Sequence, residues 1–237
     1  MKQPLKGRRI LITAGPTREY LDPVRFLSNP SSGKMGYALA EEAQKQGAKV
    51  MLISGPVGAY CHTPPPMRVI PVTSAQQMYR AVMQHAKQTD ILIMAAAVSD
   101  YRPEKTSPHK VKKRPGPMTI RLVRTPDILA ALGKMKRARA QHPPEADQPP
   151  AEAAPLLVGF AAETQNLIKN ARDKLLKKNC DLVVANQVGK NHQGFASDQN
   201  QVFLLDRDKN ITRSPLTSKR LIARFILRHI KKLLSKR

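Results

Sequence analysis

Short, almost wholly apolar runs recur along this chain, and helix-like segments separate them. The clearest runs are Ile10–Thr13, Lys49–Ile53 and Asp90–Ala96. A strand without polar alternation is buried on both faces, as in parallel sheets that helices cover on both sides. The segments between the runs, Tyr37–Gln46 and Ser74–Lys87, place apolar residues at helical spacing. The pattern predicts an α/β fold whose mostly parallel sheet carries helices on both faces.

The remaining sequence continues this rhythm, and we expect one domain over residues 1–237. Val69–Val72 is predicted as an edge strand, because Pro71 cannot donate to a neighbouring strand. Residues 137–155 contain five prolines and are predicted to form a flexible insertion. Residues 216–237 are predicted to form an amphipathic helix with a basic outer face. Further strands are expected at Thr119–Val123, Leu156–Phe160, Leu182–Ala185 and Val202–Leu205, and further helices at Asp127–Lys136 and Gln165–Lys178.

The net charge of +24 arises from 41 Lys and Arg residues against 17 Asp and Glu residues. This excess suits polyanionic small molecules, and it equally suits nucleic acid or an anionic membrane surface. Ten of the basic residues follow Asp208, after which no acidic residue occurs, so much of the excess belongs to the C-terminal segment. A nucleic-acid or anionic-surface binding protein on an α/β scaffold is therefore kept as the alternative function.

The cysteines and the hydropathy pattern indicate the compartment. Only Cys61 and Cys180 are present, which argues against a disulfide framework. Residues 1–6 lack the apolar stretch of a signal peptide, and no run reaches the ~20 apolar residues of a membrane span. We expect a cytoplasmic protein without a membrane span.

The turn Ser31-Ser32-Gly33-Lys34-Met35-Gly36 follows a polar loop and opens a helix. Serine often caps a helix, and glycine lets an anion approach the backbone closely. The free N–H groups of a first helical turn then attract phosphate. Because the same sequence is more often only a cap, it predicts a phosphate site together with the other loops, not alone.

In open parallel sheets, ligands bind beyond the carboxyl ends of the strands. Ala95–Tyr101 follows the most apolar strand. Its small residues would admit a ring or a ribose, or would serve only close helix–sheet packing. Asp100 would bind ribose hydroxyls or a divalent cation, or would only cap a turn. The basic segment Arg102–Arg114 is predicted to be a mobile flap over phosphates. A dinucleotide-binding domain is disfavoured, because no Gly-x-Gly-x-x-Gly follows the first strand and the second strand ends in Ser54-Gly55-Pro56.

Taken in order, these segments match one family. The string from Thr13 to Gly36 is the most specific, and Ala96–Arg102, Lys110–Lys113, Gly159–Thr164 and Lys174–Asn186 follow it. From Arg8 to Leu205 the chain resembles bacterial phosphopantothenoylcysteine synthetase, a ligase of coenzyme A biosynthesis. The resemblance implies a Rossmann-like fold with a flap and with extra strands for dimerisation. It also implies a homodimer and a stand-alone form, with a flavin-dependent decarboxylase as a separate partner.

The resemblance further implies a reaction in two steps. CTP activates 4′-phosphopantothenate to an acyl-cytidylate with loss of pyrophosphate, and the amine of L-cysteine then displaces CMP; Mg²⁺ is required. The preference for CTP over ATP depends on the resemblance alone. The metal ligands, and whether the flap serves its own subunit or its partner, are left open.

The resemblance assigns roles to single residues. The catalytic residues are expected to be Asn29, Lys110 and Arg25. Phosphopantothenate is expected to bind at Asn29, Ser31, Ser32, Gly33 and Ala97. The nucleotide is expected to bind at Ala95, Ala96, Asp100, Lys110, Pro126, Asp127, Phe160, Lys174 and Lys178. Both reactants of the first step are anionic, so lysines that neutralise the triphosphate suit the chemistry.

Overall fold

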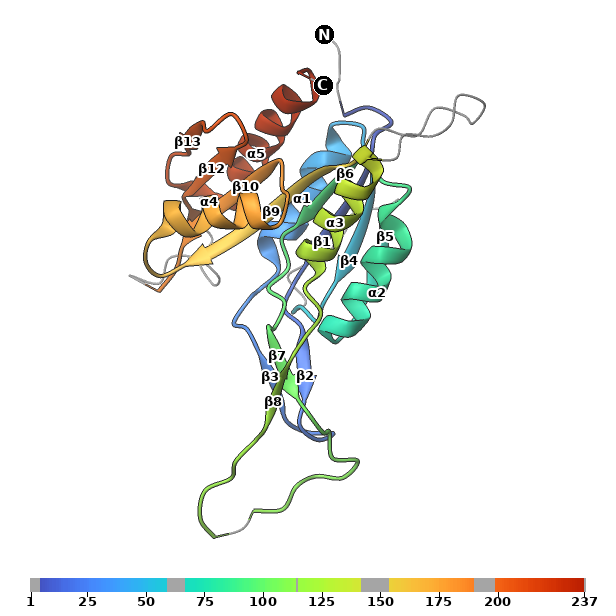
Figure 1. Ribbon diagram of the computed structural model, residues 1–237, viewed down its shortest axis with the longest axis vertical. Coiled ribbons are helices and arrows are strands. Elements are labelled where there is room, and N and C mark those ends of the chain that lie inside the picture. Colours follow the sequence, from blue (N-terminus) through green and yellow to red (C-terminus); the bar gives the residue numbers. More distant parts are fainter. Residues whose placement is uncertain (1–4, 59–66, 114, 142–153, 190–198, 237) are drawn as a thin grey trace.

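An eight-stranded sheet forms the centre of the computed structural model, which describes residues 5–58, 67–113, 115–141, 154–189 and 199–236 (Figure 1). Its strand order is β13-β12-β10-β9-β6-β1-β4-β5. The six neighbouring strands β5, β4, β1, β6, β9 and β10 run parallel to one another, β12 pairs antiparallel with β10, and β13 pairs antiparallel with β12. The predicted mostly parallel sheet is confirmed. The strands are β1 (Arg9–Ala14), β4 (Lys49–Ser54), β5 (Arg68–Pro71), β6 (Ile91–Met94), β9 (Leu156–Glu163), β10 (Leu182–Gln187), β12 (Val202–Asp206) and β13 (Ile211–Arg213).

The parallel strands follow the doubly wound order. Numbered along the chain from one to six, they are arranged 3-2-1-4-5-6 across the sheet. Strand β1 pairs with β4 on one side and with β6 on the other. The chain therefore reverses its direction of winding between β1 and β6, and the loops after these two strands diverge to leave room for a ligand.

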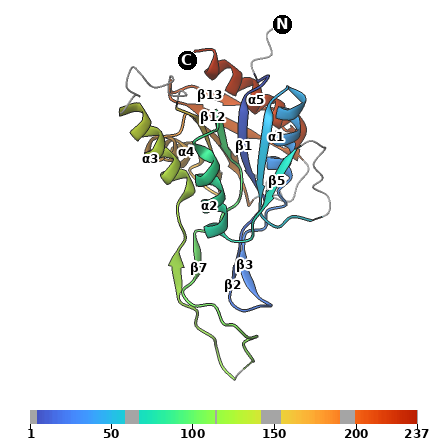
Figure 2. The same cartoon turned by 90° about the vertical axis from the view of Figure 1, so that its right-hand side faces the viewer.

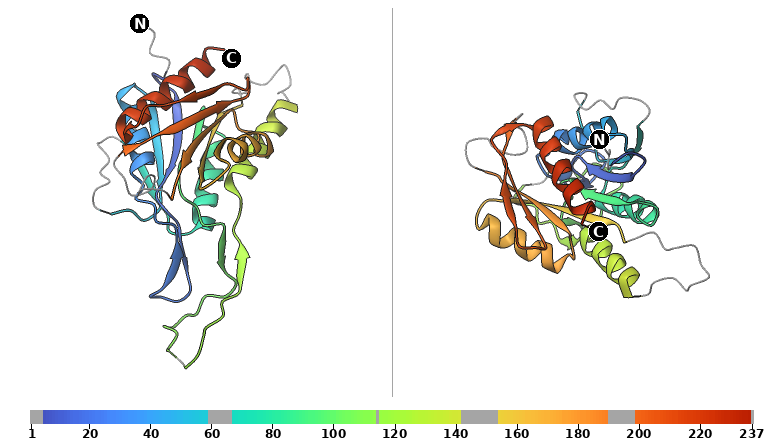
Figure 3. Two further views of the ribbon diagram at one scale, coloured as in Figure 1. Left: turned by 90° about the vertical axis from the view of Figure 1, so that its left-hand side faces the viewer. Right: turned by 90° about the horizontal axis from the view of Figure 1, so that it is seen from above.

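Five helices cover the two faces of the sheet among the described residues (Figures 2 and 3). Helices α1 (Lys34–Lys45) and α5 (Lys219–Leu234) lie on one face, and α2 (Ala75–Ala86), α3 (Ile128–Gln141) and α4 (Leu167–Lys177) on the other. Strand β1 supplies both layers: Ile10 and Ile12 belong to the core beneath α1 and α5, and Leu11 to the opposite core. Alternate side chains of a strand point to opposite faces, which explains why the run is apolar throughout.

A stalk projects from the edge of the sheet where β1 and β6 end (Figure 1). It contains two antiparallel pairs, β2 (Arg18–Tyr20) with β3 (Phe26–Ser28), and β7 (Tyr101–Pro103) with β8 (Leu122–Arg124). The described residues 104–113 and 115–121 belong to the long connection between β7 and β8, which we call the flap. The remaining short pair, β11 (Gln199–Asn200) with β14 (Thr217–Ser218), precedes α5.

Three predicted boundaries are corrected. The strand expected at Thr119–Val123 is β8, which begins at Leu122 and pairs with β7 outside the main sheet. Residues 137–141, expected in the insertion, extend α3, and residues 142–153 lie outside the described part of the chain. Helix α5 begins at Lys219 and not at residue 216, because Ser218 caps it by accepting a hydrogen bond from the Leu221 N–H.

Helix α5 is part of the core. Its residues Ile222, Ile226 and Ile230 are each 0% exposed and pack against α1 and the sheet. Arg224 at its outer edge forms an ion pair with the buried Glu42 of α1, with 3.1 Å between Nε and Oε2. The basic C-terminal segment therefore completes the fold, and the charged side chains of α5 other than that of Lys219 lie toward its outer face.

Candidate active site

The loops after β1 and β6 are joined by hydrogen bonds at the point where the winding reverses. The Thr17 N–H donates to the Ala97 carbonyl at 3.3 Å, and the Ala97 N–H donates to the Gly15 carbonyl at 2.9 Å. The Ser99 N–H donates to the Thr17 hydroxyl at 3.0 Å. These bonds give the site a fixed backbone floor at the carboxyl ends of the strands.

A first cavity of about 370 Å³ lies on this floor. Asn29 is fixed at its edge, because its side-chain Nδ2 donates to the carbonyls of Ala97 at 3.1 Å and Val98 at 3.3 Å. Two carbonyl acceptors determine which end of the amide carries the donors, so Oδ1 is left as an acceptor. The predicted residues Asn29, Ser31, Ser32, Gly33 and Ala97 all line this cavity, and Ala95 lines it too.

The start of α1 forms one wall of the first cavity. Gly33 is its N-cap, with a φ of 76°, and no side chain caps the helix. Serine does not cap this helix with its side chain: the Ser31 hydroxyl instead accepts a hydrogen bond from the Gly33 N–H at 3.3 Å. A Cβ at Gly33 would lie 2.5 Å from the Val57 Cγ1, so the turn requires glycine for both space and conformation.

A second cavity of about 540 Å³ adjoins the first. It extends from the loop after β6 to the start of α3 and the last turn of α4. Its predicted residues are Ala96, Asp100, Pro126, Asp127, Phe160, Lys174 and Lys178. The residues that line both cavities are Ala96, Val98, Asp100, Phe160 and Lys174. We call this set the shared wall.

Lysines and carboxylates set the electrostatics of the second cavity. Lys174 donates from Nζ to the Phe160 carbonyl at 2.9 Å, while Lys178 forms an ion pair with Asp127. Burial acts to raise the pKa of the Asp127 carboxyl, but hydrogen bonds from Lys178 and from the Ala130 N–H outweigh it and lower the pKa below its ordinary value. Asp127 is thus ionised at neutral pH and orients Lys178.

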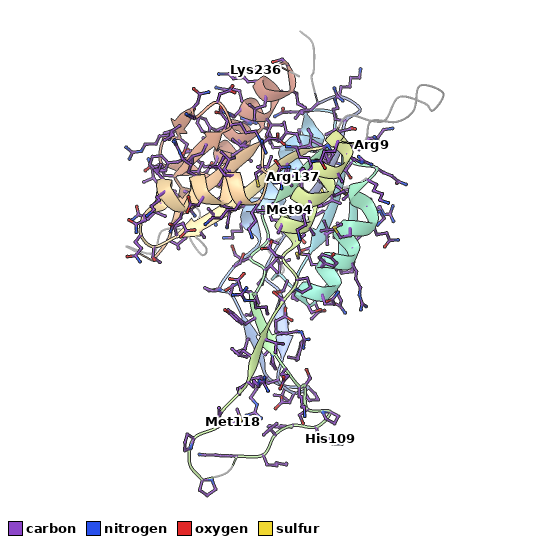
Figure 4. The ribbon with its side chains drawn as sticks, viewed as in Figure 1. Arg9, Met94, His109, Met118, Arg137 and Lys236 are labelled. Carbon is purple, nitrogen blue, oxygen red and sulfur yellow. The ribbon has the colours of Figure 1, made fainter. Side chains whose placement is uncertain are left out.

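Two residues expected to be catalytic lie elsewhere. Lys110 belongs to the flap beside His109, which Figure 4 shows at the far end of the stalk from Met94 and the sheet. Arg25 follows Asp22 between β2 and β3 and forms an ion pair with it, with 2.6 Å between Nη2 and Oδ2. Neither Lys110 nor Arg25 lines either cavity. Within one chain the structure does not bring them to Asn29.

Four further polar residues to which the sequence assigned no role of their own also line the first cavity: Lys34, Asn186, Asn200 and Lys219. Asn186 stands near the end of β10, so the rule that ligands bind beyond strand ends could have found it. Lys219 is 7% exposed and begins α5, where no strand-end signal exists. Among the described residues, no group of three or more His, Cys, Asp or Glu side chains is placed to hold a metal ion.

A family profile described as DNA/pantothenate metabolism flavoprotein C-terminal domain matches residues 5–234. The chain belongs to this family. The family predicted from the sequence is thereby confirmed, and so is the expected Rossmann-like α/β fold.

Relatives within this flavoprotein C-terminal domain family are similar over nearly the whole chain. The coenzyme A biosynthesis bifunctional protein CoaBC of Bacillus subtilis (strain 168) is 46% identical over 228 residues, covering 96% of this chain and 52% of that protein. The CoaBC protein of Escherichia coli (strain K12) is 43% identical over 231 residues, covering 95% and 52%. The chain thus spans about half the length of these relatives.

A solved structure supports the same relationship. The crystal structure of the C-terminal domain of a CoaBC bifunctional protein has a TM-score of 0.78 to this structure, at 41% identity, and the match covers 100% of both chains. No described helix has the length and apolar character needed to cross a lipid bilayer.

Proposed function

We propose that this chain is a phosphopantothenate–cysteine ligase, which joins 4′-phosphopantothenate and L-cysteine at the expense of CTP. The observation that carries the proposal is the pair of adjoining cavities that share a wall containing Lys174. A reaction that transfers an acyl group from a nucleotide to an amine needs two such compartments in contact. Relatives named as coenzyme A biosynthesis proteins support the substrate class.

In this proposal phosphopantothenate occupies the first cavity and the nucleotide the second. The positive end of α1, together with Ser31, Ser32 and Gly33, would bind the phosphate of phosphopantothenate. Lys174 and Lys178 would neutralise the triphosphate. The carboxylate would then attack the α-phosphorus, and pyrophosphate would leave.

Asn29 would act in the second step. Because its amide N–H groups already donate to Ala97 and Val98, its free Oδ1 can accept a hydrogen bond from the amine of L-cysteine. The amine would be oriented toward the acyl carbon without any added charge, and CMP would be displaced. Positioning of this kind needs no nucleophilic side chain on the protein.

Mg²⁺ fits the second cavity as an ion held mainly by the substrate. Magnesium commonly binds to one or two carboxylates together with substrate phosphates, and Asp100 is the carboxylate on the shared wall that is available for this role. When bound, the ion would withdraw charge from the triphosphate.

The flap is proposed to supply Lys110 to the nucleotide. Because Lys110 lines neither cavity within one chain, this role requires the flap to close or to reach a second copy. A homodimer, as the family resemblance implies, would allow the second route. The alternative function, binding of nucleic acid or an anionic surface, would place the activity on the basic face of α5.

Pyrophosphate release tests the proposal. With phosphopantothenate, cysteine and Mg²⁺ present, CTP should support release faster than ATP, GTP or UTP, and Asn29→Ala or Lys110→Ala should nearly abolish product formation. Equal release with all four nucleotides would contradict the CTP assignment. No release with any of them, from folded protein, would refute the ligase proposal.

A further inference from the structure

The flap is fastened to the β2–β3 hairpin at several points. The Thr106 hydroxyl donates to the Tyr20 carbonyl at 3.1 Å, and the Ser107 N–H donates to the Leu21 carbonyl at 2.9 Å. Both contacts lie on the arm that descends from β7. The third attachment is at Val111, next to Lys110, and there the partners are charged.

Both backbone groups of Val111 are held by one ion pair. The Val111 N–H donates to Asp22 Oδ2 at 3.1 Å, and Arg25 Nη2 donates to the Val111 carbonyl at 2.6 Å. The same guanidinium is bound to Asp22, through Nε at 3.0 Å and Nη2 at 2.6 Å. Charged hydrogen bonds are about twice as strong as neutral ones, so this is the firmest of the three attachments.

Asp22 is itself fixed. Its side chain is fully buried, and Oδ1 accepts from the N–H groups of Val24 at 2.9 Å and Arg25 at 2.8 Å. The hydrogen bonds from the Arg25 side chain hold the pKa of the Asp22 carboxyl well below its usual range. Burial acts to raise this pKa, and the backbone N–H donors act to lower it. The ion pair therefore persists throughout the neutral pH range, on a hairpin whose residue Ser28 is tied to the site through Thr17.

We propose that Asp22 and Arg25 form a latch that grips the flap at Val111 and thereby positions Lys110 to reach the nucleotide held by a second copy of this chain. Arg25 is then a positioning residue, which explains why it lies outside both cavities. The role of Lys110 rests on the function proposed above, whereas the latch itself rests only on the geometry at Val111. The two parts can be tested separately.

Hydrogen exchange of the flap tests the latch. In Arg25→Gln and in Asp22→Asn, amides of residues 108–113 should exchange about tenfold faster, the change expected when an opening equilibrium shifts by ~1.4 kcal/mol. Amides of β1 should be unaffected, which shows that the chain stays folded. Arg121→Gln is the matched control, because Arg121 pairs with Glu104 at 3.5 Å between the arms of the flap. Unchanged flap exchange in both Arg25→Gln and Asp22→Asn would overturn the latch.

A double-mutant cycle tests the link to Lys110. Arg25→Gln should lower kcat/KM for CTP about tenfold in the unaltered chain and cause no further loss in a Lys110→Ala background. Arg25→Lys should restore activity only in part, because an ammonium lacks the planar fork with which the guanidinium bonds Asp22 through Nε and Nη2 while also reaching the Val111 carbonyl. Equal losses in both backgrounds would overturn the link. If the unaltered chain has no ligase activity, the proposed function fails, while the exchange result still decides the latch.

Discussion

Replacing Lys174 by glutamine removes the one cation on the shared wall. Lys174 donates a hydrogen bond from Nζ to the Phe160 carbonyl at 2.9 Å. It stands on the last turn of α4 and lines both cavities. The substitution keeps a side chain of similar length with an N–H donor, so we expect it to act on charge and not on packing.

The magnitude follows from the position of that charge. Loss of one donor aimed at developing negative charge costs ~2.7–4 kcal/mol, which is 10²–10³ in rate. We therefore expect kcat/KM for CTP to fall by about two orders of magnitude. The hydrogen bond to a neutral carbonyl contributes only ~1 kcal/mol to folding, so Tm should fall by no more than ~2–4 °C in a chain of this length.

The assay is pyrophosphate release at varied CTP, with thermal unfolding measured in parallel. Lys177→Gln is the matched control, since Lys177 lies on the same helix, pairs with the exposed Asp173 at 3.5 Å and lines neither cavity. It should keep full activity. A normal kcat/KM for CTP in Lys174→Gln, or an equal loss of kcat/KM in Lys177→Gln, would refute a specific role for the Lys174 charge.

Three further outcomes are expected. Gly33→Ala should lower the free energy of unfolding in urea by ~1–3 kcal/mol, because the φ is 76° and the new methyl would lie 2.5 Å from the Val57 Cγ1. It should also raise the KM for phosphopantothenate, and an unchanged KM would contradict the placement of this substrate at the start of α1. Ile226→Ala, at a side chain that is 0% exposed, should lower the free energy of unfolding by ~2–5 kcal/mol. Leu221→Ala, at a side chain on the same helix that is 47% exposed, should change it by less than ~1 kcal/mol. Equal losses in the two variants would contradict the packing of α5 against the core. Burial lowers the pKa of His229, so as the pH falls below ~6.5 the unfolded chain binds a proton at this residue before the folded chain does. The free energy of unfolding should therefore fall more steeply between pH 7.5 and 5.5 than it does in His229→Gln. Parallel plots of this free energy against pH would contradict the prediction.

The central sheet could be predicted because its signal is local. A run such as Ile10–Thr13 is apolar at successive positions only when both faces are covered, and the structure confirms this. The position of Thr119–Val123 could not be predicted in the same way. Strand propensity does not specify a partner, and three of these residues stay outside any strand while the others pair with β7.

The residues of the candidate site also differ in how far local sequence signals predict their positions. Asn29, Ala97, Phe160 and Lys174 follow or face the ends of strands, and the structure brings them together. The position of Lys110 depends on the direction in which the flap leaves the sheet, and the spacing of apolar residues does not predict that direction. Lys219 was missed for a related reason, since its burial against the first cavity arises from the packing of α5.

The shared wall has a consequence for ligand design. The two cavities are separated by the shared wall alone, which consists of Ala96, Val98, Asp100, Phe160 and Lys174. A nucleoside tethered to a phosphorylated tail could fill both at once, and its second half would then bind at an effective concentration in the millimolar range. If the proposed function holds, resistance to such a bisubstrate compound would be difficult to acquire, because substitutions in the shared wall would weaken binding of both proposed reactants.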